Sequence, residues 1–407
     1  MKLKPATLGL PAALLVLSGA ARADLTPFSF GASETIEHES NVYHSPSAKE
    51  TWLSSTSLQA AIDENIGRQK LLANGQVAYN RYTNDVPSNT SYTLGTELDW
   101  NTIGDLSGTL GANTARQRYL YGLNGEVASG STNNLQTSNH YYSHAQLGGL
   151  ARWTLFGGGD INQRHYSDPT FNVNKEEQWS MNGGTRYQTS PDLSFGLVGS
   201  YTHGKYPNLP TGPSAFSLRS IDFTTNWQAS GNSALSLRTG YTRERDDGRP
   251  DRKYWNGDIG WQWSPPSHFK VSADLSRDSD ADTAASSGAV LGSSNLSGRS
   301  VNTTLRTGVT YEFSPKTNLV GGFQYAKRRY ASGTLPVSIT SPIPITTASG
   351  SNRTTQLSLT AHYLPTLNSD VSCGFVHEVR HADESIAPVT PAYTANNILC
   401  SAEIQFR

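Results

Sequence analysis

The stretch Trp261–Asp280, WQWSPPSHFKVSADLSRDSD, contains two short runs in which an apolar or aromatic residue occupies every second position. A Ser-Pro-Pro-Ser break at 264–267 separates the two runs. Alternation with a period of two predicts strands with two different faces. One face carries Ser, Asp and Lys, and the other carries Trp, Phe, Val and Leu. Such a hairpin requires water on one side and an apolar medium on the other.

The start of the chain indicates export from the cytoplasm. Lys2 and Lys4 precede an almost wholly apolar run, Ala6 to Leu17, and Ala21-Arg22-Ala23 fits the small-x-small pattern of a signal-peptidase site. The apolar run is too short for a comfortable transmembrane anchor. We therefore predict a cleaved secretory signal over residues 1–23 and a mature chain from residue 24 to residue 407.

Composition narrows the fold class. The chain has 407 residues, a net charge of -1, 37 Gly, two Met and a mean hydropathy of -0.48. No later segment approaches the roughly 20 apolar residues of a membrane helix, which excludes a helical membrane protein. The near-zero charge gives no electrostatic reason to expect nucleic acid as a partner.

Alternation recurs along the mature chain in about 18 runs, each close to the length that a tilted strand needs to cross a bilayer. Short and long breaks between the runs alternate. The short ones fall at 67–68, 101–104, 149–151, 190–192, 230–232, 264–267, 314–317 and 365–368. The long ones fall near 38–50, 83–89, 115–136, 166–177, 203–215, 246–251, 278–298, 330–351 and 381–394.

This asymmetry predicts an all-β fold: one transmembrane antiparallel up-and-down β-barrel of about 18 strands, with short periplasmic turns and long extracellular loops, in the outer membrane of a Gram-negative bacterium. A propeller or solenoid would need a self-similar repeat, and the sequence shows none beyond its turn chemistry. A soluble sandwich of this size would have shorter strands and several domains.

Aromatic residues support the barrel, because outer-membrane barrels carry aromatic belts at both interfaces. One predicted belt, at the short-turn ends, comprises Trp100, Trp153, Trp227, Trp261 and Trp263; the other comprises Trp52, Trp179, Tyr201 and Tyr325. The last run, Ile398 to Phe406, resembles the C-terminal targeting strand of bacterial outer-membrane proteins, apart from the added Arg407.

Short motifs resemble the EpsL-type outer-membrane proteins associated with exopolysaccharide biosynthesis and exosortase loci. The motifs are Asp24-Leu25-Thr26-Pro27-Phe28, an acidic first strand with Glu34, Glu37 and Glu39, the segment Ser40-Asn41-Val42-Tyr43-His44, and the ending from Cys400-Ser401-Ala402 to Phe406-Arg407. Glu39-Ser40-Asn41 departs from the more acidic pair expected before Asn. The resemblance implies export or anchoring of an extracellular polysaccharide, with periplasmic export components as further partners.

A barrel of this size is wide enough for an aqueous channel. The candidate lumen-lining residues are Tyr142, Arg152, Asp160, Arg164, Arg186, Arg238, Tyr254, Lys270, Asp274, Arg306 and Arg328. The two tyrosines could serve as aromatic platforms for sugars, but any solvated lumen would show a similar mixture of residues.

The 115–136 loop follows the fifth predicted strand, and in porins the loop at this position folds inward and narrows the pore. Arg116, Arg118 and Glu126 would then be constriction residues. An ordinary exposed loop is the equal alternative.

We find no catalytic motif in the sequence. The chain lacks G-x-S-x-G and H-E-x-x-H patterns. His140 and His144 have weak metal-ligand spacing without carboxylate or Cys company, so we expect no metal site and no cofactor. A TonB-type receptor would need a plug domain, for which the early first strand leaves no room.

Three function classes follow: a polysaccharide-export barrel first, a general diffusion or sugar porin second, and a structural or adhesive surface barrel third. In each class outer-membrane lipid surrounds the protein.

The two cysteines, Cys373 and Cys400, share the apolar, lipid-facing parity of neighbouring strands. A cross-strand disulfide would form if their register brought them opposite each other. A register offset of one or two positions would leave two small lipid-facing residues, and the sequence slightly favours this second arrangement.

Overall fold

A computed structural model describes residues 27–119, 134–148, 152–169, 172, 175–208, 214–247, 250–279, 300–333, 348–384 and 391–406. The predicted signal segment lies outside these residues and remains a prediction. The described residues form the following strands: β1 (Phe28–Glu39), β2 (Thr51–Ile66), β3 (Gln69–Tyr82), β4 (Asn89–Asn101), β5 (Leu106–Arg118), β6 (Leu135–Leu147), β7 (Trp153–Tyr166), β8 (Glu176–Ser190), β9 (Leu193–Tyr206), β10 (Ser214–Ser230), β11 (Ser233–Asp246), β12 (Arg252–Trp263), β13 (Phe269–Ser279), β14 (Ser300–Ser314), β15 (Thr317–Gly333), β16 (Ala348–Tyr363), β17 (Ser369–Ala382) and β18 (Tyr393–Phe406). Among the described residues, no helix has the length and apolar character needed to cross a membrane.

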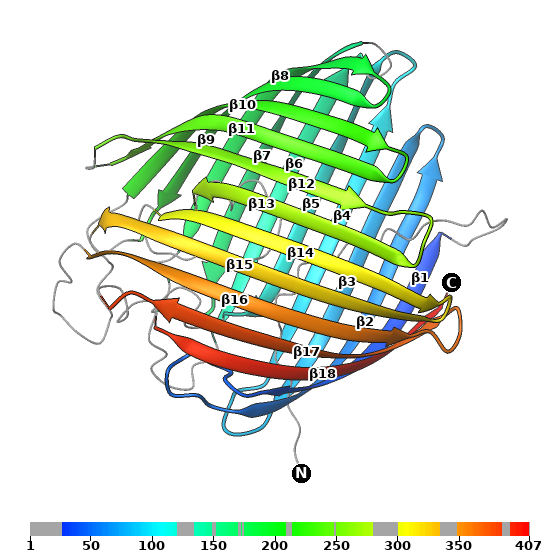
Figure 1. The fold of residues 1–407 in the computed structure, drawn as a ribbon, viewed down its shortest axis with the longest axis vertical. Helices are drawn as coiled ribbons and strands as arrows, with labels where there is room; N and C mark the ends of the chain where they lie inside the picture. The colour runs from blue at the N-terminus through cyan, green and yellow to red at the C-terminus, as the bar shows by residue number, and fades with distance from the viewer. Residues whose placement is uncertain are drawn as a thin grey trace.

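The strands form one closed antiparallel barrel. Each strand pairs with its neighbours in sequence, and β1 also pairs with β18 from Phe30↔Phe406 to Glu39↔Asn397. Figure 1 shows the blue first strand and the red last strand meeting at this seam. Closure leaves no unpaired sheet edge, which a lipid environment requires of a spanning sheet. The predicted up-and-down barrel is confirmed.

Short connections gather at one end of the barrel, which we call the short-turn end, and long connections at the other, which we call the loop end. Gly67 has a φ of 65°, and it opens the two-residue turn between Ile66 and Gln69. Positive φ at the first turn position is a type II′ feature that favours glycine. A register shift between Gln228 and Ser230 precedes the Gly231-Asn232 turn.

The outer surface of the barrel is apolar. Leu58, Ile221 and Leu155 are 66%, 65% and 58% exposed, although each lies within a strand. Exposed aromatic residues mark both ends: Trp153, Trp227 and Phe313 lie near the short-turn end, and Trp52, Trp179 and Trp255 lie near the loop end. An apolar band between two aromatic belts is the surface of a barrel in lipid. The protein therefore lies in the outer membrane.

Candidate functional site

Alternate residues of each strand form the inner wall. On β10, Ser220 and Asp222 are buried, whereas Ile221 and Phe223 are exposed. Residues that pair across neighbouring strands share a face, so the register extends this alternation around the barrel. We call the buried parity inward and the other parity outward.

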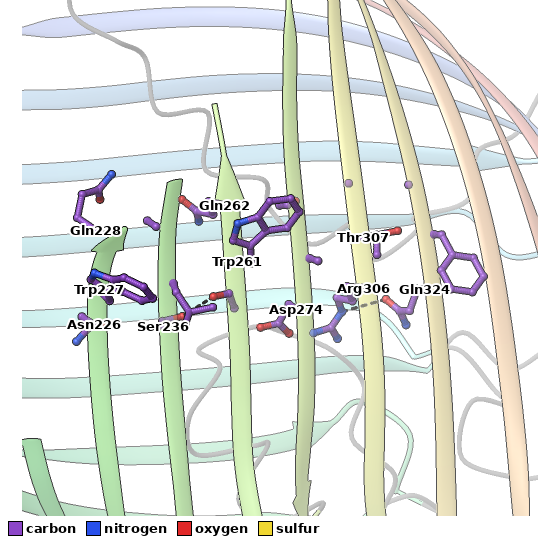
Figure 2. Close-up of a pocket in the computed structure, with 18 of the residues that line it drawn as sticks. Asn226, Trp227, Gln228, Ser236, Trp261, Gln262, Asp274, Arg306, Thr307 and Gln324 are labelled. Atoms are coloured by element: carbon purple, nitrogen blue, oxygen red, sulfur yellow. Dashed lines mark hydrogen bonds between the residues drawn. The ribbon is translucent and has the colours of Figure 1, made fainter. Parts of the chain in front are cut away.

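A cavity of about 890 Å³ lies against the inner wall between β8 and β17. It reaches the short-turn end, because Pro191 and Asp192 of the β8–β9 turn line it. Most of its inward side chains are polar, although Ala234 and Val376 also line it; the polar ones include Gln262, Asp274, Arg306, Gln324, Gln356 and Ser358. Figure 2 shows Asp274, Arg306 and Gln324 on neighbouring strands, where Arg306 Nε donates to Gln324 Oε1 at 3.1 Å. Amide and charged groups suit water and polar solutes rather than an apolar ligand.

One guanidinium in this wall is surrounded by carboxylates. Arg238 Nε donates to Asp258 Oδ1 at 2.6 Å, and its Nη2 lies 3.0 Å from both oxygens of Asp278. Its Nη1 lies 3.5 Å from Asp222 Oδ1, which also accepts a 2.8 Å bond from Asn256. Because these residues come from β10, β11, β12 and β13, the register itself assembles the cluster. A single positive charge among three carboxylates leaves this wall negative.

Elsewhere on the inner wall, from β6 to β8, acidic groups lie beside basic ones. Arg164 Nη1 contacts Glu176 Oε2 at 2.8 Å, and His140 Nε2 lies 3.1 Å from Asp160 Oδ1. Tyr142 donates its hydroxyl to Glu97 and stacks on the His140 ring at 5.1 Å. Among the described residues, no group of three or more His, Cys, Asp or Glu side chains could hold a metal ion.

The structure places most of the predicted lumen residues on the inner wall. The inward ones are Tyr142, Asp160, Arg164, Arg186, Arg238, Tyr254, Lys270, Asp274, Arg306 and Arg328. Arg152 is the exception, because it is exposed and lies in the connection before Trp153 rather than within β7. Its side chain belongs to the short-turn rim.

The predicted constriction residues do not act together. β5 continues to Arg118, so Arg116 lies within the strand at the outward parity of the exposed Leu110. Arg118 is buried, and its guanidinium carbon lies 4.8 Å from the Tyr82 ring centroid and 5.6 Å from that of Tyr43. Glu126 lies outside the described residues. The prediction for Arg116 was wrong because the sequence placed the end of the strand too early.

A different segment lies within the loop end of the barrel. Val42 packs with Leu53, Tyr82 and Val86 in a small buried cluster. Asn41 Nδ2 donates to the Thr394 carbonyl at 3.1 Å, which ties the segment to the start of β18. We call residues 41–44 the mouth segment. The sequence analysis used this segment only for a family resemblance and did not predict its packing inside the barrel.

His44 ends the mouth segment against the inner wall. Its ring stacks on Tyr393 with centroids 4.8 Å apart and planes 8° apart. Burial lowers the pKa of His44 below its ordinary value of 6.5; the nearby Glu378 opposes this effect and Arg380 adds to it. The segment is therefore docked with a neutral imidazole.

The two cysteines form a disulfide. Cys373 on β17 pairs directly with Cys400 on β18, with Cα atoms 4.1 Å apart. The favoured register offset was wrong, because the β17–β18 pairing runs without a shift from Ser369 to Arg380. Both residues have the outward, lipid-facing parity that the sequence predicted.

The near-zero net charge conceals a separation of charge between the two faces. Among the described residues, inward carboxylates outnumber the cations of the lumen. The acids are Glu37, Glu39, Asp63, Glu97, Asp99, Asp160, Glu176, Asp222, Glu244, Asp246, Asp258, Asp274, Asp278, Glu312, Asp370, Glu378 and Glu403, and the bases are Lys70, Arg164, Arg186, Arg238, Arg252, Lys270, Arg306, Arg328, Arg380 and the buried Arg118. On the outward face the order is reversed; the bases include Arg219, Arg243, Arg245, Lys253, Arg277, Lys327, Arg329 and Arg353. The charged residues of the inner wall are therefore mainly acidic, whereas the outward face is basic at its loop end, beyond the apolar band.

No family model matches the sequence, and no curated protein is significantly similar to it. Solved outer-membrane proteins share the fold. The FrpB iron transporter from Neisseria meningitidis is 13% identical with a TM-score of 0.52; the match covers 87% of this chain, which spans only 63% of that longer chain. OpdK from Pseudomonas aeruginosa is 12% identical over 93% of this chain and 99% of its own, with a TM-score of 0.49.

A BenF-like porin from Pseudomonas fluorescens Pf-5 is 11% identical over 94% of this chain and all of its own, with a TM-score of 0.47. At such identities the likeness is one of fold alone. The EpsL-type resemblance is not tested by these comparisons and remains a prediction. The fold and the inner wall together describe an 18-stranded antiparallel outer-membrane β-barrel with a largely polar lumen.

Proposed function

We propose that this barrel is a passive diffusion channel for small polar solutes and that it favours cations. The observation that carries the proposal is the acidic, hydrophilic inner wall of a closed 18-stranded barrel. Barrels of 16 to 18 strands are wide enough for an aqueous channel. Amide, hydroxyl and carboxylate groups along this wall can replace part of the hydration shell of a passing solute.

Charge on the wall supports cation preference. Rings and clusters of Asp and Glu select cations because they raise the local cation concentration in a pore with low-dielectric walls. Arg238 neutralises only part of the charge of Asp222, Asp258 and Asp278. Asp274 adds a further carboxylate at the cavity, beside Arg306.

The inward tyrosines give less support to a polysaccharide path. Sugars need accessible aromatic faces, and the Tyr142 ring already stacks on His140 while its hydroxyl is bonded to Glu97. Tyr254 is buried beneath the Arg252 guanidinium, whose central carbon lies 5.2 Å from the ring centroid. Polysaccharide export therefore rests on the sequence resemblance, and the diffusion channel is the better-supported function.

Reconstitution in planar lipid bilayers tests the channel directly. Purified, folded protein should produce stepwise increases in ion current, and heat-unfolded protein from the same preparation should produce none. Asp258→Asn combined with Asp274→Asn should lower conductance at low salt, where wall charge is least screened. A folded barrel that inserts without conducting would contradict the channel and favour a structural or adhesive role.

A further inference from the structure

The basic outward face carries basic residues in direct register. Lys327 on β15 is directly opposite Arg353 on β16, which is in turn directly opposite His381 on β17. Cross-strand partners have their Cβ atoms about 5 Å apart, and like charges in this arrangement destabilise a sheet. Arg329 lies two residues beyond Lys327 on the same face. An anion bound between these side chains would offset this repulsion.

Few protein groups in the described structure neutralise this row. None of the three basic residues Lys327, Arg329 and Arg353 forms an ion pair within the described chain. Asp383 is a nearby counter-charge: its carboxylate accepts bonds from the Ser351 amide at 2.6 Å and from the Ser351 hydroxyl at 3.1 Å. These bonds lower its pKa, with smaller contributions from Arg353 and Lys327. One carboxylate does not balance three cations.

The row lies at the edge of the apolar band, on its loop side. One step toward the short-turn end, the register passes through Leu275, Leu305, Tyr325 and Thr355. Tyr325 belongs to the predicted loop-end belt, whose rings lie at the level of lipid headgroups. Lys327 and Arg353 therefore project at or just beyond this level, within reach of headgroup phosphates.

A second row of basic residues lies on the outward face of β10, β11 and β12. Arg219 on β10 is directly opposite Arg243 on β11, which is directly opposite Lys253 on β12. Arg243 has a carboxylate partner in Asp251 at 2.9 Å, and Arg219 lies over the Tyr201 ring at 5.6 Å. Basic residues thus occur in two outward rows at the loop end, one on β10 to β12 and the other on β15 to β17.

We propose that the outward cluster Lys327, Arg329 and Arg353 binds the phosphate groups of a phosphorylated lipid in the leaflet at the loop end. The lipid phosphates compensate the in-register like charges, while the acyl chains lie along the apolar band formed by residues such as Leu357, which is 50% exposed. The lipid is then an integral part of the outer surface. This inference depends on the membrane barrel and not on whether the lumen conducts.

Thermal unfolding in nonionic detergent tests the proposal, with diphosphoryl lipid A as the probe, the same lipid stripped of its phosphates as one control and inorganic phosphate as another. Diphosphoryl lipid A should raise the Tm of the wild-type protein, and neither control should. Lys327→Gln combined with Arg353→Gln should bind the probe about 30-fold more weakly, since each basic residue contributes about 1 kcal/mol to binding an anionic surface.

The Tm of the double variant without lipid distinguishes lost lipid binding from a folding defect. Without lipid, its Tm should equal or exceed that of the wild type, because the opposed charges have been removed. Lys316→Gln, which removes one exposed charge in the short turn before β15, should keep the full lipid effect. Equal stabilisation of wild type and double variant by diphosphoryl lipid A would overturn the proposal, as would an equal effect of the dephosphorylated lipid.

Discussion

Arg238 Nη2 lies 3.0 Å from both carboxylate oxygens of Asp278, across two strands of the inner wall. The same guanidinium contacts Asp258 and Asp222. This single side chain therefore holds together carboxylates from three strands that would otherwise repel one another. Arg238 therefore contributes both to the stability of the wall and to the charge of the lumen.

Replacing Arg238 with Gln should destabilise the barrel, because three neighbouring carboxylates lose their counter-ion. Removing one partner of a largely buried ionic cluster costs about 3 kcal/mol. Urea unfolding of the refolded protein in detergent, followed by tryptophan fluorescence, measures the change. Arg186→Gln is the matched control: Arg186 is also inward but has no ion pair among the described residues, so it should cost about 0.5 kcal/mol or less. Equal losses of unfolding free energy in the two variants would refute the claim that Arg238 holds the three carboxylates together.

The mouth segment should respond to pH through His44. Its pKa is lowered in the docked state, so the undocked segment binds a proton more readily. Docking is therefore fully favoured above about pH 6.5 and weakens as the pH falls below that value. Because the docked segment lies within the loop end of the barrel, its undocking should widen the lumen there. Conductance in planar bilayers should therefore rise as the pH is lowered from about 7.5 to about 5.

His44→Phe keeps a ring against Tyr393 but cannot take up a proton, so it should remove this rise. His38→Phe, on the outward face of β1 beside Trp52, should leave the rise intact. A wild-type conductance that stays constant over this pH range would contradict the docking account.

The Cys373–Cys400 disulfide should be present in protein isolated from the membrane. Unreduced, denatured protein should show no mass shift with a maleimide reagent, and reduced protein should show two additions. Replacing both cysteines with Ser should lower stability by about 2–4 kcal/mol, because the bond closes a long loop in the unfolded chain. Labelling of both thiols without reductant would exclude the bond.

The orientation of the barrel in the membrane can be determined from the accessibility of introduced cysteines on whole cells. Single cysteines introduced at Asp85 or Glu384, both exposed at the loop end, should react with a membrane-impermeant reagent in a background where the native pair is Ser. Cysteines at Ile103 and Leu367, which are 91% and 86% exposed at the short-turn end, should react only after the cells are lysed. The reverse labelling pattern would show that the barrel has the opposite orientation in the membrane.

The fold was predictable because a barrel in lipid leaves two patterns in the sequence. One is the alternation of polar and apolar residues along each strand, and the other is the alternation of short and long connections. Alternation assigned residues such as Arg238 and Asp274 to the inner wall, and break lengths distinguished the two ends. Register was not predictable, because pairing depends on where each strand ends. The disulfide register and the position of Arg116 were misjudged for this reason. The Arg238 cluster and the Lys327–Arg353 row also exist only through register.

The mouth segment was missed for a different reason. Val42 and Tyr43 lie in a polar connection whose apolar residues are too few to show a period, and their partners, Leu53, Tyr82 and Arg118, come from three separate strands. Only the assembled barrel brings these residues together.

The most direct measurement of the central claim is the reversal potential of the open channel under a gradient of potassium chloride across a planar bilayer. The acidic inner wall predicts a potential with the sign of potassium permeation, and it should decrease in Asp258→Asn combined with Asp274→Asn. A potential near zero, or one with the sign of chloride permeation, would contradict a cation-favouring channel.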